Sequence, residues 1–224
     1  MNKSFFNQLF FVLLLIECHS VSAQRDFFVQ ASPGVAHCFK TPLTIKQSGY
    51  PDLKINAEYK TESWKLPIYY SIKLGTSKEK RGWELELIHL KIYLQNNPPE
   101  IQQFQVSHGF NLVQINRTWQ LDRVIIRTGA GVVLAHPENI VRGNMLEENS
   151  FRGTGYCLAG PCLQISAEKL FCLYEGLYLS AELKTTAAYA WIPVHNGHAN
   201  TSHLGMHGLV GLGYRFKKYV FVRL

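Results

Sequence analysis

The sequence has no apolar run long enough to cross a membrane as a helix, because such a helix needs ~20 residues. Charged residues are also few, at 17% of the chain against ~25% in soluble domains. The net charge is +7, but Lys and Arg form no stripe with interleaved aromatic residues. The sequence therefore predicts neither a helical membrane protein nor a nucleic acid as partner.

Cysteine is scarce as well. Cys157 and Cys162 flank Leu-Ala-Gly-Pro, a sequence typical of a turn, so a local disulfide is allowed in an oxidising compartment. Two free thiols are the alternative. The C-x4-C spacing lacks the second pair that a zinc site needs, and no cofactor is predicted.

The first residues have the layout of a secretory signal peptide. Lys3 lies near the start, an apolar stretch covers 9–16, and small residues precede a cleavage site after Ala23. We therefore expect a signal peptide at 1–23 and a single β-barrel domain at 24–224.

A two-residue alternation of apolar and polar side chains runs through most of the remaining chain. Phe104 and Val106 alternate with Gln105 and Ser107, and successive strand residues point to opposite faces. Similar segments predict strands at 27–36, 65–75, 82–94, 101–116, 120–135, 161–171, 174–190 and 203–216, with a further pair at 53–61 and 218–224. The predicted fold is all-β, a closed antiparallel up-and-down β-barrel of about 8–10 strands.

The size of the residues on the polar face of the strands indicates whether this face lines a lumen or the outside of the barrel. Gly205, Gly211 and Gly213 share one face of the last predicted strand, and glycine weakens a strand that faces solvent. A narrow lumen explains these glycines better, since they leave room for long charged side chains. We therefore expect a membrane barrel with residues such as Val106 and Ile126 facing lipid.

The alternation places charges of both signs in this lumen. They form a predicted interior network of Glu84, Glu86, Arg123, Arg127, Glu182, Lys184 and Arg215, with Glu168 nearby. Each charge needs a partner, because an unpaired buried charge is costly. The network would plug the barrel, and a path for a ligand or an ion is the alternative.

Four segments resemble small exported bacterial β-barrel proteins of the outer membrane: 82–89, 106–111, 129–137 and 209–216. The resemblance implies a location in the outer membrane, with its lipid as partner. A protein or polysaccharide partner stays unknown. Lipid A-modifying acyl hydrolases of this membrane are similar in size and build.

Such a hydrolase needs a serine activated by a histidine. The two residues share a strand face only at positions i and i+2, and no His-x-Ser follows the signal peptide. We therefore predict no catalytic residue. Ser107 with a cross-strand His207 is the remaining candidate pair.

Histidines are densest near the end of the chain. Imidazole suits Zn, Cu or Ni, but these histidines have no Cys or carboxylate between them, so no metal site is predicted. The candidates are His195, His198, His203 and His207. His89, His108 and His136 are isolated in the sequence and carry no separate signal.

The sequence thus predicts an outer-membrane β-barrel of structural or binding type, with its extracellular loops as interaction surface. The longest expected loops are 142–156 and 193–202. The first alternative is an outer-membrane acyl hydrolase acting on lipid A. The second is a lipocalin-like periplasmic carrier, which would be apolar inside and polar outside.

Overall fold

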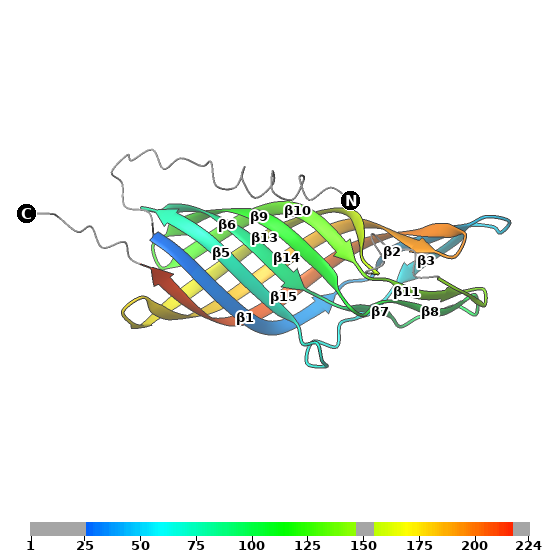
Figure 1. Ribbon diagram of the computed structural model, residues 1–224, viewed down its shortest axis with the longest axis horizontal. Helices are drawn as coiled ribbons and strands as arrows, with labels where there is room; N and C mark the ends of the chain where they lie inside the picture. The colour runs from blue at the N-terminus through cyan, green and yellow to red at the C-terminus, as the bar shows by residue number, and fades with distance from the viewer. Residues whose placement is uncertain (1–25, 147–154, 217–224) are drawn as a thin grey trace, which may run out of the picture.

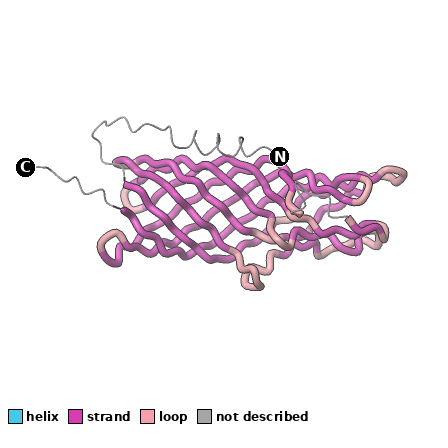
Figure 2. Tube along the Cα trace, in the orientation of Figure 1, coloured by secondary structure: helices cyan, strands magenta, loops and turns pink. Residues whose placement is uncertain are grey.

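The computed structural model describes residues 26–146 and 155–216, and all regular elements in these ranges are β-strands (Figure 2). No helix in the described part is long and apolar enough to cross a bilayer. The predicted signal peptide at 1–23 and the strand expected at 218–224 lie outside the described residues.

Eight strands form a closed antiparallel ring, in which each strand pairs with two neighbours (Figure 1). They are β1 (Asp26–Cys38), β5 (Tyr70–Lys78), β6 (Arg81–His89), β9 (Phe110–Leu121), β10 (Val124–Ala135), β13 (Cys157–Tyr174), β14 (Leu177–Val194) and β15 (Gly197–Phe216). β1 pairs with both β5 and β15, which closes the ring. The predicted closed antiparallel barrel is confirmed.

The two ends of the barrel differ. At one end, short turns at 79–80, 122–123 and 175–176 join neighbouring strands; we call it the turn end. At the other end, the chain forms further strands beyond the ring (Figure 1); we call it the loop end. Its strands are β2 (Thr41–Gln47), β3 (Leu53–Ala57), β4 (Tyr59–Lys60), β7 (Ile92–Leu94), β8 (Ile101–Val106), β11 (Glu138–Val141) and β12 (Asn144–Met145).

The barrel is apolar outside, and its interior nearer the turn end is polar. Ile165 on the outer face of β13 is 56% exposed, whereas Arg127 on the inner face of β10 is 1% exposed. Glycines on the inner face make room for polar neighbours, since a Cβ at Gly211 would lie 2.1 Å from the Ser32 hydroxyl oxygen. This arrangement is the reverse of a lipocalin-like carrier, and that alternative is wrong.

One predicted orientation is wrong. Val106 is predicted to face lipid, but it is buried in an apolar core together with Phe104 and Phe110. The predicted strand 101–116 also divides into β8 and β9, with a break at 107–109. The physical reason is that this segment borders the loop end, where the five-stranded sheet and the β2–β3 extension of the barrel sheet cover a shared core, as in a soluble sandwich.

Of the two alternatives for Cys157 and Cys162, the disulfide is wrong and the structure has the two free thiols. Cys157 and Cys162 both lie within β13, and both are free thiols. An extended strand separates them by ~16 Å, more than twice the ~7 Å limit for Cα atoms of a disulfide. The Leu-Ala-Gly-Pro sequence between them continues the strand, with a bulge opposite Val133 and Leu134.

Candidate functional site

A network of charged side chains fills the half of the barrel nearer the turn end. Inner-face positions of β5, β6, β10, β13 and β14 supply its members, all almost completely buried: Lys73, Glu84, Glu86, Arg127, Glu168, Glu182 and Lys184. Four carboxylates therefore surround three cations.

Arg127 links three of the carboxylates. Its Nε donates to Glu84 Oε2 at 2.6 Å, and one of its terminal nitrogens donates to Glu168 Oε2 at 2.5 Å. The other terminal nitrogen lies 3.7 Å from Glu182 Oε1. Charge-assisted contacts of this kind are among the strongest hydrogen bonds in proteins.

Two lysines complete the network. Lys73 Nζ donates to Glu182 Oε2 at 2.6 Å and to Glu168 Oε1 at 3.3 Å, and Lys184 Nζ donates to Glu86. Polar side chains add to the network at Glu86, which also accepts hydrogen bonds from Ser71, Asn116 and Gln164.

The structure thus places Glu84, Glu86, Arg127, Glu182 and Lys184 in one network, as the alternation indicated. The prediction for Arg123 is wrong. This residue is exposed in the turn at 122–123, after the end of β9 and before the start of β10.

Two more residues differ from the predicted network. Arg215 is half-buried and lines a small cavity at the turn end together with Glu168. Lys73 was missed, although it shares the inner face of β5 with the buried Ser71 and lies within the predicted strand 65–75.

The other half of the ring is filled by apolar side chains. Ile88, Leu112 and Val133 on neighbouring strands are completely buried in the core that continues into the loop end. At the turn end, the cavity beside Arg215 has a volume of about 30 Å³, room for roughly one or two water molecules. The described lumen is therefore packed, with charges in one half and mainly apolar side chains in the other, beside the buried His203 and His207.

The four predicted metal candidates do not converge. His195 and His198 lie at the tip of the β14–β15 hairpin, whereas His203 and His207 are buried on the inner face of β15. His207 is held by the Tyr69 hydroxyl at 3.0 Å and by Thr186 at 2.8 Å.

Ser107 and His207 do not form a catalytic pair. Ser107 lies in the break between β8 and β9, and its hydroxyl contacts Nδ1 of the neighbouring His108 at 3.2 Å. Glu138 Oε1 lies 2.5 Å from the same nitrogen. A triad needs the nucleophile and the acid on opposite ring nitrogens, so this arrangement does not activate Ser107.

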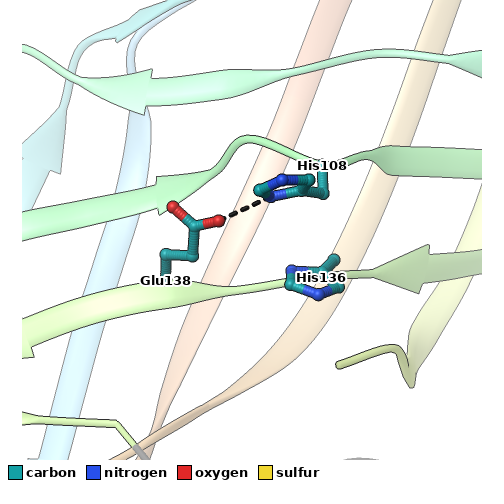
Figure 3. A group of neighbouring side chains, drawn as sticks. All are labelled: His108, His136 and Glu138. Atoms are coloured by element: carbon teal, nitrogen blue, oxygen red, sulfur yellow. Dashed lines mark ion pairs between the residues drawn. The ribbon is translucent and has the colours of Figure 1, made fainter. Parts of the chain in front are cut away.

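A different group brings metal-ligating atoms together at the loop end. The ligand atoms of His108, His136 and Glu138 all lie within 4.8 Å of one another (Figure 3). In the sequence, these two histidines are isolated. Partial burial raises the pKa of the Glu138 carboxyl, but hydrogen bonds from Gln105 and Ser107 and the adjacent His108 outweigh this effect and leave that pKa below its usual value.

The comparisons with known proteins concern the fold alone. No family model matches the sequence, and no curated protein matches it. Among solved structures, the outer membrane protein AlkL in DMPC lipid bilayers is similar, with a TM-score of 0.53 and 9% identity over 91% of this chain and 96% of that one. The chain has the fold of a small outer-membrane β-barrel protein.

Further structures of this kind give lower scores. OprG from Pseudomonas aeruginosa has a TM-score of 0.45 and 12% identity over 88% of this chain and 98% of that one. Neisserial surface protein A has a TM-score of 0.41 and 13% identity over 85% and 97%, respectively. The resemblance that the sequence indicated is confirmed at the level of the fold, and the apolar outer face supports the predicted outer-membrane location.

Proposed function

We propose that this protein is a closed outer-membrane barrel of binding type, which presents the small sheets of its loop end as an interaction surface outside the cell. The observation that carries this proposal is the packed interior. Glu86, Lys184 and Arg127 block the lumen near the turn end, and Ile88 and Leu112 block it near the loop end. A barrel without a path through it acts as an anchor for what it displays.

The displayed part is regular and internally bonded. β2 and β3 extend the β14–β15 hairpin, and Arg142 connects this extension to the β11–β12 turn. Its guanidinium donates to Gln47 Oε1 and to the Pro51 carbonyl, both at 2.9 Å, and stacks 4.7 Å from the Tyr50 ring. Such a surface loses little conformational entropy on binding.

Exposed aromatic side chains on this surface suit a partner. Tyr50 and Trp191 are more than half exposed at the loop end, and aromatic residues are enriched in protein interfaces. The class of partner, protein or polysaccharide, stays open in this proposal.

We also propose outer-membrane lipid as a partner of the apolar outer face. The segment 61–69 projects to the side of the barrel (Figure 1). It carries Trp64 and Leu66, which is 84% exposed, beside Lys65. An aromatic and an apolar side chain next to a lysine fit the boundary between lipid tails and headgroups.

A packed lumen predicts no channel activity. Purified protein inserted into a planar lipid bilayer should give no steady conductance above the membrane alone, because water and ions find no continuous path. A porin measured in the same bilayer serves as the positive control. A stable open level would contradict the closed barrel and favour the ion path.

The proposal also predicts that the loop end faces outward, as long loops do in outer-membrane barrels. In a Cys157→Ser background, a membrane-impermeant maleimide should label Lys46→Cys on intact cells, because Lys46 is exposed on β2. The native Cys172 is exposed near the turn end and should be labelled only after permeabilisation. Labelling of Cys172 on intact cells would show that the turn end faces outward and would contradict the proposed orientation.

A further inference from the structure

Two breaks in neighbouring strands lie side by side at the loop end. One separates β8 from β9 at 107–109, and the other separates β10 from β11 at 136–137. β9 pairs with β10, and β8 pairs with β11, so the breaks are held opposite each other. The backbone N–H of His136 donates to the Gly109 carbonyl at 3.1 Å and joins them directly.

Three side chains with metal-ligating atoms point toward one another here. Two come from the breaks, and the third comes from the first residue of β11. Nδ1 of His108 is 2.5 Å from Oε1 of Glu138, and the rings of His108 and His136 have centroids 4.8 Å apart (Figure 3). Within residues 26–146 and 155–216, no other trio of His, Cys, Asp or Glu brings its ligand atoms together in this way.

Further features of this group favour the binding of a ligand. Nδ1 of His136 is buried and has no hydrogen-bond partner among the described residues. Oε2 of Glu138 accepts a hydrogen bond from Gln105 at 2.6 Å, the kind of outer contact that orients a metal-ligating carboxylate. Tyr156 packs edge-on against His136 and donates its hydroxyl hydrogen to the His108 carbonyl at 2.9 Å.

We propose that His108, His136 and Glu138 bind a divalent transition-metal ion, with Zn²⁺ as the reference and Ni²⁺ and Cu²⁺ in the same class. Imidazole nitrogens suit these ions, and two histidines with one glutamate are a known ligand set for zinc that leaves a fourth position to water. Mg²⁺ and Ca²⁺ prefer sites made of oxygen alone, so this group selects against them.

The adjustment that binding requires is small. Metal–ligand distances of ~2.0–2.1 Å put tetrahedral ligand atoms about 3.3 Å apart. His108 Nδ1 and Glu138 Oε1 must therefore separate slightly to admit the ion. The His108 side chain is 63% exposed and can rotate without disturbing the core. Metal binding at this site does not depend on the proposed interaction surface, because the metal ion binds without a partner molecule.

Isothermal titration of the full chain with ZnCl₂ tests this proposal. The protein is produced without a histidine tag and refolded in detergent. We expect a single Zn²⁺ per chain, and no heat from MgCl₂ at the same concentrations. His108→Gln and Glu138→Gln should each raise the Kd for Zn²⁺ at least about tenfold, since each removes one of three ligands.

His198→Gln is the matched control, because His198 is an exposed histidine of the same loop end outside the trio. It should leave the Kd unchanged. Heat-dependent gel migration verifies that each variant is folded. The proposal is overturned if wild-type protein binds no Zn²⁺, if His108→Gln binds as well as wild type, or if His198→Gln weakens binding as much as His108→Gln does.

Discussion

Replacing Arg127 with leucine should lower the free energy of unfolding by ~3–5 kcal/mol. The Arg127 side chain is 1% exposed and donates hydrogen bonds to Glu84 and Glu168. Glu84 has no other hydrogen bond or ion pair to a described residue, so the variant leaves a buried carboxylate without a partner. Urea titration of the refolded protein, followed by tryptophan fluorescence, measures the change.

Arg123→Leu is the control for this measurement. Arg123 is exposed in the turn at 122–123, and its replacement should cost less than ~1 kcal/mol. Combining Arg127→Leu with Glu84→Leu should recover part of the loss, because the stranded charge is removed. Equal costs for Arg127→Leu and Arg123→Leu would show that the network does not stabilise the barrel.

Replacing Ile165 with lysine should cost ~2–4 kcal/mol of the free energy of folding into lipid. Ile165 is 56% exposed on the outer face of β13, between Leu163 and Lys169 on the same face. A lysine there brings a charge into the hydrocarbon core of the bilayer. Unfolding in lipid vesicles by denaturant, compared with wild type, gives the change.

Leu173→Lys is the control that distinguishes exposure to lipid from exposure to water. Leu173 is 52% exposed on β13, but it lies beside the turn at 175–176, where we expect the bilayer to end. Its replacement should cost at most ~1 kcal/mol. In a water-soluble barrel, both substitutions would have the same small effect, and that result would contradict the membrane barrel.

Most strands of the ring could be predicted because their alternation is local. The predicted segments 82–94 and 203–216 overlap β6 and β15, and their inner faces carry the small and charged residues. β2 at Thr41–Gln47 was missed. It is short and contains Pro42, and its pairing partner β15 is far away in the sequence.

The candidate site could be predicted only in part. Alternation identified most of the inward charges, but it missed Lys73 and did not indicate which carboxylate each cation meets. Lys73 reaches Glu168 and Glu182 because strand register and tilt bring distant positions to the same depth of the barrel. The trio of His108, His136 and Glu138 was missed for the same reason, since the pairing of β9 with β10 joins its members.

The sequence by itself determined that the chain is a barrel with small and charged residues inside, because side-chain direction in a strand depends only on position. The tertiary structure alone decided where the membrane barrel ends. Beyond that point, the apolar face of 104–112 turns inward, since two sheets covering a core reverse the preference that lipid imposes. It also decided which charges pair and which histidines meet, because both depend on contacts between residues that are distant in the chain.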